Sequence, residues 1–416
     1  MKRLLAVLSL CLWITLLPFP ANPAITPAAA SDASGAIDGA LASDVFASQS
    51  ASAPAASGPE TYAGQSLCLP GIYLQAPGNC LPLGPSAYLT RMAQEGLVLP
   101  IRPLPATHPD ASLSQMTDSY ILVTKQAIPV YKTIADAAAH SKYRVLAYGM
   151  KYLAITDRVV ENNVVYYQIV SGGWVEAGEA GASCCIHAGR FLGLVFSQTP
   201  RNNFGWIVDT TTSRTAPGYQ SPETGKKYYR ENVVQIYAVK SADKTDWYMI
   251  GPNEWVEHRY IRELAINTTP PKGVVGNRWI EINLYQQTMA VYDQDRLVYA
   301  TLIASGMAPF YTRPGLFQIQ TKKLTETMSG SFEPDRSDYY YLENVPWTMY
   351  YDEERALHGA YWRAVYGYPQ SHGCVNLAPG DAHWLYDWAH VGDWVYVWDP
   401  SGQTPTDPKF YGPGGA

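Results

Sequence analysis

The residues best suited to chemistry are a cysteine and a histidine that both lie next to glycines. Cys374 occurs in the run Ser371-His372-Gly373-Cys374-Val375-Asn376, and the pair His358-Gly359 precedes it by a short loop. A thiolate is a strong nucleophile, and a neighbouring imidazole both lowers the pKa of a thiol and transfers its proton. The spacing therefore predicts nucleophilic catalysis, with Cys374 as the nucleophile and His358 as the proton acceptor.

The surrounding residues supply candidates for the supporting roles. His372 lies two positions before Cys374, so in extended backbone it falls on the same side and can assist. Gly373 allows close approach of the backbone, so the amides of residues 372–374 can form an oxyanion hole. Ser371 and Asn376 are expected to fix the loop, and the Gly359 carbonyl can hold the tautomer of His358. The candidates for substrate contact are Tyr350, Met349 and Trp362, with core packing as the alternative for each.

Two alternatives use the same residues differently. His358, His372 and Cys374 are all legitimate zinc ligands, so a metal site is the stronger competitor. A purely structural cysteine is the weaker one, because several polar groups gather here in a loop punctuated by glycine.

The other cysteines indicate an oxidising compartment. They are Cys11, Cys68, Cys80, Cys184 and Cys185. Cys11 falls in a predicted signal peptide, so five cysteines remain in the mature chain, and one is left over after pairing. Cys68 and Cys80 flank a turn-rich stretch and are predicted to form a small-loop disulfide. Cys184 and Cys185 either bond to each other or pair elsewhere, and a metal site that adds His187 is the alternative.

The N-terminus and the composition predict an exported protein. Met-Lys-Arg, the apolar run 4–19 and the small residues 28–31 are typical of a secretory signal peptide over residues 1–30. A retained anchor is the alternative, but the run is short for a membrane span. No later segment is apolar enough to cross a bilayer. The net charge of −6 and the absence of long basic runs argue against nucleic-acid binding. We therefore expect a secreted, extracellular or cell-wall-associated protein.

The chain divides into several parts by composition. Residues 31–60 read as a flexible Ala/Ser/Pro linker and residues 61–118 as a disulfide-closed region. A repeat follows, because the pattern at 166–169 and 174–176 returns at 247–250 and 255–257 with identical spacing. It predicts two copies of one small β domain, at residues 119–180 and 190–266.

The last part, residues 274–400, contains the chemical motif. Alternating runs at 279–284, 288–292 and 296–304 predict a three-strand meander. Ala378 to Asp381 open a helix that runs to Ala389, with Asp381 placed to stabilise its first turn, and residues 391–399 form a final strand. The fold class is therefore mainly β.

Two resemblances rest on these residues. Leu357-His358-Gly359-Ala360-Tyr361-Trp362 and the run from Ser371 to Ala382 resemble the catalytic signature of the L,D-transpeptidase (YkuD) family, over Val275 to Asp399. Gly359 replaces a serine that some members carry. The repeated aromatic hairpins resemble bacterial SH3-like (SH3b) domains. Together they imply a YkuD-like β-sandwich with a short helix, preceded by two small SH3-like barrels that either bind cell wall or act as spacers.

The first resemblance implies a reaction. Cys374 would attack a peptidoglycan tetrapeptide stem, release D-alanine through a thioester, and pass the acyl group to the amine of a second stem to form a 3→3 crosslink. Water or a protein amine are alternative acceptors. The resemblance implies no metal or organic cofactor, and it implies acylation by carbapenem-type inhibitors. The competing functions are a non-catalytic wall-binding protein and a zinc-dependent wall amidase or peptidase.

Overall fold

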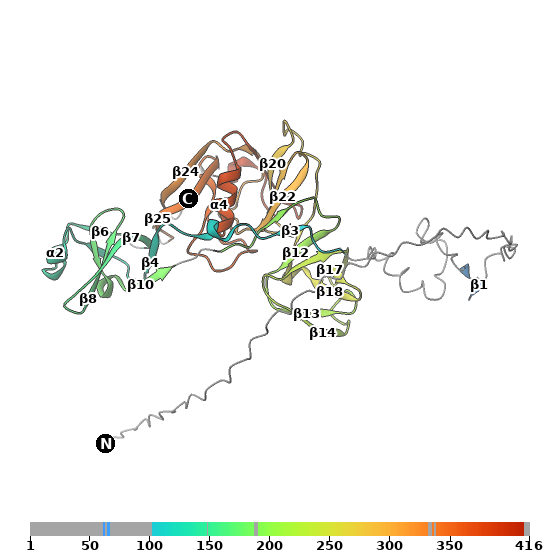
Figure 1. The fold of residues 1–416 in the computed structure, drawn as a ribbon, viewed down its shortest axis with the longest axis horizontal. Helices are drawn as coiled ribbons and strands as arrows, with labels where there is room; N and C mark the ends of the chain where they lie inside the picture. Colours follow the sequence, from blue (N-terminus) through green and yellow to red (C-terminus); the bar gives the residue numbers. More distant parts are fainter. Residues whose placement is uncertain are drawn as a thin grey trace, which may run out of the picture. The chain divides into compact units, whose positions relative to one another are not determined.

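The computed structural model describes residues 61–62, 65–66, 102–147, 149–186, 190–331, 335–336 and 338–411. The predicted signal peptide, the linker 31–60, Cys68, Cys80 and His187 lie outside these residues. The described part is mainly β, as predicted (Figure 1). None of its helices is long and apolar enough to span a membrane.

The first sheet of the C-terminal region is buried on both faces. Its order is β23-β28-β20-β21-β22-β11-β3. The predicted meander is confirmed as β20 (Arg278–Asn283), β21 (Thr288–Asp293) and β22 (Arg296–Leu302). Around it lie β3 (Ala106–Thr107), β11 (Leu194–Phe196), β23 (Gly315–Gln318) and β28 (Trp394–Trp398). Ile280 and Val291 pack into one core, whereas Trp279 and Tyr292 pack into another on the opposite face. This explains why these strands are apolar at nearly every position.

The second sheet carries the predicted chemical residues. It includes β24 (Thr321–Gly330), β25 (Tyr340–Asp352), β26 (Arg355–Gly359) and β27 (Val375–Leu377). Met349, Leu357 and Val375 from this sheet share one core with Ile280 and Val395 of the first sheet. The predicted helix is α4 (Pro379–Trp388), which contributes Leu385 to that core. The two sheets therefore enclose this core between them, and the core supports β26 and β27 from one side.

Strands that precede the C-terminal region continue its sheets. β7 pairs in parallel with β25, through Tyr340 opposite Met150, and β11 pairs with β22.

The elements before the C-terminal region form two groups in chain order. The first group comprises β4 (Ser119–Val123), β5 (Ile128–Val130), α2 (Ile134–Ala138), β6 (Arg144–Leu146), β7 (Met150–Glu161), β8 (Val164–Ile169), β9 (Trp174–Glu176), α3 (Ala177–Ala180) and β10 (Ala182–Ile186).

The second group comprises β12 (Asn203–Ile207), β13 (Thr211–Arg214), β14 (Glu223–Tyr228), β15 (Val233–Ile236), β16 (Ala238–Ala242), β17 (Thr245–Gly251), β18 (Glu254–Glu257), η2 (His258–Tyr260) and β19 (Ile261–Leu264). The remaining elements are β1 (Thr61–Tyr62), β2 (Gln65–Ser66), η1 (Ala111–Ser114) and η3 (Pro408–Phe410).

The sequence repeat is the same hairpin built twice. In β8–β9, Tyr167 lies opposite Val175, and in β17–β18, Tyr248 lies opposite Val256. All four side chains are buried. A short helical turn, α3 or η2, follows each hairpin directly. The identical spacing in the sequence therefore reflects identical cross-strand register.

Asp381 lies in the first turn of α4, as predicted, and has a further role that the sequence did not indicate. Its carboxylate accepts hydrogen bonds from the Tyr299 hydroxyl at 2.7 Å, the Thr301 hydroxyl at 2.5 Å and the backbone amides of Leu192 and Gly193 at 3.2 and 3.1 Å. This buried carboxylate joins α4, β22 and the segment before β11.

We predict that Asp381→Ala destabilises the protein by about 3–5 kcal/mol, because several buried donors would lose their shared acceptor. Chemical denaturation followed by tryptophan fluorescence measures this change. Asp387→Ala is the matched control on the same helix, because Asp387 is 59% exposed and should change stability by less than about 0.5 kcal/mol. Equal effects of the two substitutions would contradict the anchoring role.

Candidate active site

The parallel pairing of β26 with β27 brings the predicted chemical residues together. His358 lies opposite Asn376, and Leu357 lies opposite Val375. Because side chains alternate along a strand, Leu357 and Val375 face the core while His358 and Asn376 share the other face. Cys374 is two residues before Asn376, so it falls on the same face as a diagonal neighbour of His358.

The loop before Cys374 is fixed by hydrogen bonds to its backbone. The Ser371 hydroxyl donates to the carbonyl oxygen of Cys374 at 2.5 Å and accepts from the amide of Gly373 at 3.2 Å. The Thr312 hydroxyl donates to the Gly373 carbonyl at 2.8 Å. Gly373 has φ +124°, a conformation that L side chains rarely adopt, so glycine is required here.

Two hydrogen bonds define the tautomer of His358. Its Nδ1 lies 3.2 Å from the Gly359 carbonyl oxygen, and its Nε2 lies 3.0 Å from the side-chain nitrogen of Asn376. A carbonyl only accepts and an amide NH₂ only donates, so Nδ1 carries the proton and Nε2 is the basic nitrogen. Arg363 donates to the side-chain oxygen of Asn376 and so orients that amide.

Burial keeps both reactive groups neutral. Cys374 is 3% exposed and His358 is 2% exposed. Burial raises the pKa of the Cys374 thiol to about 11, against opposing contributions from the Ala356 amide and the Arg355 charge. Burial lowers the pKa of His358 to about 4, and the hydrogen bond to Gly359 only partly offsets it. Proton transfer from thiol to imidazole is therefore unfavourable before substrate binds.

Two expectations for this loop differ from the structure. The imidazole was expected to lower the thiol pKa, but removal of the sulfur from water dominates and raises it. Gly373 was expected to offer its amide to an oxyanion, but that amide donates to Ser371. The sulfur of Cys374 itself accepts from the Ala356 amide at 3.4 Å and donates to the Glu354 carbonyl at 3.7 Å.

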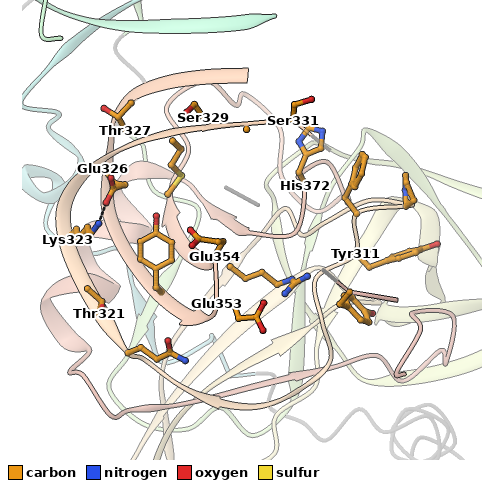
Figure 2. Close-up of a pocket in the computed structure, with 18 of the residues that line it drawn as sticks. Tyr311, Thr321, Lys323, Glu326, Thr327, Ser329, Ser331, Glu353, Glu354 and His372 are labelled. Carbon is orange, nitrogen blue, oxygen red and sulfur yellow. Dashed lines mark hydrogen bonds and ion pairs between the residues drawn. The ribbon is translucent and has the colours of Figure 1, made fainter. Parts of the chain in front are cut away.

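A cavity of about 810 Å³ adjoins the cysteine loop, and it is lined by Glu354, Arg355 and His372 but not by Cys374 or His358 themselves (Figure 2). Figure 2 shows Lys323 and Glu326 on one wall and His372 and Tyr311 on the opposite wall, with Glu354 between them. Its lining comes from β24, from the turn before β26, from the loop at 309–311 and from the chain near Tyr411. The cavity is large enough for a peptide segment and carries both acidic and basic groups.

The predicted substrate-contact residues separate into three environments. Tyr350 lines the cavity, as does His372, whose ring stacks on Tyr340 with centroids 5.6 Å apart. Met349 is instead fully buried in the core, because neighbouring residues of β25 face opposite sides of the sheet. Trp362 lies beside His358, with ring centroids 5.7 Å apart.

Three further residues of the site were not identified from the sequence. Thr312 holds the Gly373 carbonyl, Arg363 orients Asn376, and Arg355 lines the cavity next to the thiol. The spacing of Arg355 gave no signal, because positions three apart in a strand face opposite sides and Arg355 is three residues before His358. Thr312 and Arg363 lie in loops whose folding only the tertiary structure defines.

The zinc site that would use His358, His372 and Cys374 is not supported by the geometry. Within the part of the chain that the structure describes, no group of three or more His, Cys, Asp or Glu side chains is arranged to hold a metal ion. Cys184 is in a disulfide, whereas Cys374 is in the thiol form.

Comparison with known protein families identifies the domain that contains this site. Residues 277–397 match the family model of the L,D-transpeptidase catalytic domain, YkuD. This segment is therefore an L,D-transpeptidase catalytic domain, and the match includes His358, Cys374 and Asn376.

Individual proteins show the same likeness. L,D-transpeptidase 1 of Mycobacterium tuberculosis is 27% identical over 200 residues, which cover 43% of this chain and 76% of that protein. An L,D-transpeptidase structure from Stackebrandtia nassauensis is 27% identical, covering 29% of this chain and 55% of that one, with a TM-score of 0.23. The catalytic domain of an Enterococcus faecium L,D-transpeptidase acylated by ertapenem is 27% identical, covering 30% of this chain and 100% of that one, with a TM-score of 0.27.

We predict that alkylation of Cys374 by iodoacetamide rises about tenfold per pH unit between pH 7 and pH 10. With a thiol pKa of about 11, the reactive thiolate is a minor form that grows with pH across this whole range. Intact mass over time measures the rate, and Cys374→Ala gives the background. A rate that already reaches a plateau by pH 7 would indicate a preformed thiolate–imidazolium pair and would contradict the neutral resting state.

Proposed function

We propose that this protein is a peptidoglycan L,D-transpeptidase that works by acyl transfer through a cysteine thioester. The observation that carries the proposal is the placement of Cys374, His358 and Asn376 on one face of the β26–β27 pair, next to Glu354, Arg355 and His372, which line a peptide-sized cavity. The matched catalytic domain supports the same function. A non-catalytic wall-binding protein would not require this arrangement.

The first half-reaction follows from the neutral state of the site. The sulfur of Cys374 attacks the carbonyl carbon that precedes the terminal D-alanine of a tetrapeptide stem. Because the thiol and imidazole are both neutral, the proton leaves the sulfur as the carbon–sulfur bond forms, and Nε2 of His358 receives it. The carbon–nitrogen bond then breaks, the proton passes to the leaving amine, and D-alanine departs. A thioester remains on Cys374.

The second half-reaction regenerates the thiol. The side-chain amine of a second stem attacks the thioester, His358 takes the proton of that amine, and the sulfur leaves and is reprotonated. The product is a 3→3 crosslink. Glu353 and Glu354, which line the cavity, attract the ammonium form of this side chain, which gives up one proton to solvent before the neutral amine attacks.

Asn376 and Gly359 act on His358 as positioning residues. The carbonyl of Gly359 fixes Nδ1–H, and the amide of Asn376 holds the ring so that Nε2 faces the shared side of the strands. Asn376 has to release Nε2 when that nitrogen accepts a proton. A substrate that enters the cavity can trigger this exchange, because it displaces water and adds a hydrogen-bonding amide.

We further propose that the two repeated β modules are SH3b-like and that the protein is exported to the cell wall. The repeated hairpin register supports the first point, and the N-terminal sequence supports the second. Protein recovered from the wall or the medium should begin near residue 31, and a recovered chain that retains residues 1–30 would contradict the cleavage.

We predict that the full mature chain forms a covalent adduct with a carbapenem on Cys374, and that it releases D-alanine from a tetrapeptide stem. Both reactions need the same thiol to attack a carbonyl, so Cys374→Ala should abolish both. Intact mass detects the adduct, and liquid chromatography of the peptide products detects D-alanine and the crosslinked dimer.

His358→Gln is the companion variant. It should slow both reactions by about 10²–10⁴-fold, because a general base is lost while the thiol remains. A wild-type protein whose thiol reacts with iodoacetamide but which forms no adduct and releases no D-alanine would contradict the proposed function.

A further inference from the structure

Arg355 is a cationic side chain whose charge acts on the reacting sulfur and lowers the pKa of its thiol. The two residues on either side of Arg355 in sequence both bind that sulfur. The Glu354 carbonyl accepts a hydrogen bond from the thiol, and the Ala356 amide donates one to the sulfur. A Cβ atom placed on Gly373 would lie 3.5 Å from Nε of Arg355. Arg355 therefore lies directly across from the residue before Cys374, and it also lines the cavity.

The guanidinium is held in a defined position. Its Nη1 donates to Asp352 at 3.1 Å, and its charged end lies 5.3 Å from the ring centroid of Tyr411. Arg313 binds the same carboxylate, with Nε at 2.8 Å from Asp352. Both Asp352 and Arg355 are buried. A fixed guanidinium loses little entropy when it binds a planar anion, so Arg355 is preorganised for a carboxylate.

Covalent geometry places a carboxylate near this residue during the proposed reaction. In a peptide that ends in D-alanine, three bonds separate the attacked carbonyl carbon from the carbon of the terminal carboxylate, a span of about 4 Å. Sulfur attack brings the carbonyl carbon to Cys374. The terminal carboxylate must then lie in the part of the cavity that adjoins the nucleophile, where Arg355 is located.

The other charged groups of the cavity act in different ways on an anion. Lys323 also lines the cavity, but it is paired with Glu326. Glu353 and Glu354 repel an anion, and Glu354 does so close to the nucleophile, where its charge raises the pKa of the Cys374 thiol. Arg355, which acts on the same thiol in the opposite sense, is therefore the group that can hold a substrate carboxylate there.

We propose that Arg355 binds the terminal carboxylate of the donor peptide and makes the site specific for peptides with a free carboxyl group next to the scissile bond. This inference rests on the proposed function. The guanidinium donates charge-assisted hydrogen bonds to the carboxylate, which orients the scissile carbonyl toward Cys374. An amidated peptide loses this interaction.

The test compares two synthetic tetrapeptide stems with diaminopimelate at the third position, one ending in D-alanine and the other in D-alaninamide. Binding to the full mature Cys374→Ala protein is measured by calorimetry, so that no turnover occurs. The acid should bind about 10- to 100-fold more tightly than the amide, as expected for charged hydrogen bonds of about 1.5–3 kcal/mol. Adding Arg355→Met should remove this preference and leave amide binding unchanged, whereas Arg355→Lys should retain part of it.

Arg313→Met is the matched control, because Arg313 shares Asp352 but does not line the cavity. It should keep the preference for the acid. Equal binding of acid and amide to Cys374→Ala, or equal weakening of both by Arg355→Met, would overturn the inference. If Arg355→Met is unfolded in a thermal melt, Arg355→Lys is measured in its place. A reduced preference for the acid then supports the inference, and an unchanged preference contradicts it.

Turnover of the acid peptide by the protein with its native cysteine separates the two proposals. Release of D-alanine without any acid preference overturns the Arg355 inference alone. A clear acid preference in binding, without release of D-alanine, overturns the proposed function and leaves Arg355 as a carboxylate-binding residue.

Discussion

The rest of the site depends on the burial of a thiol and an imidazole on one face of two paired strands. The pairing of β26 with β27 sets His358, Asn376 and Cys374 on one face and sends the alternate residues into the core. The same burial that fixes these side chains also removes them from water, and this favours the neutral form of each. The thiolate and the imidazolium are therefore formed only while the substrate is being attacked.

This constraint explains the network of neutral hydrogen bonds around His358. An imidazole with one fixed Nδ1–H has only one nitrogen free to act as base, so Gly359 and Asn376 decide which one it is. A glycine suffices at position 359 because only its carbonyl is used. Charged side chains surround the site: Arg363 binds the Asn376 amide, and Asp352, Arg313 and Arg355 form a group of ion pairs next to the cavity. The thiol and the imidazole between them are themselves neutral.

Much of the fold was predictable from sequence, because it depends on local patterns. The meander, the helix after the cysteine motif and the repeated hairpin each have a clear period or spacing, and each is present. The nucleophile and its histidine were identifiable because their glycine-rich motifs are specific. For Met349 the sequence left substrate contact and core packing open, since adjacent residues of a strand face opposite sides and the sequence of an aromatic-rich strand does not show which side is the cavity; the structure places it in the core. The direction of the Cys374 pKa shift, the use of the Gly373 amide and the role of Asp381 all depend on burial and on contacts between distant segments, which no local pattern contains.

The most direct test of this account is the protonation state of His358 in the resting protein. ¹⁵N NMR of the histidine side chains in the full mature chain resolves Nδ1 from Nε2, and His358→Gln identifies the signal. With a pKa of about 4, His358 should remain neutral from pH 5 to pH 8, with a proton on Nδ1 and none on Nε2. A signal with both nitrogens protonated at pH 7 would show an imidazolium already paired with a thiolate, and would contradict a site whose charge develops only as the substrate reacts.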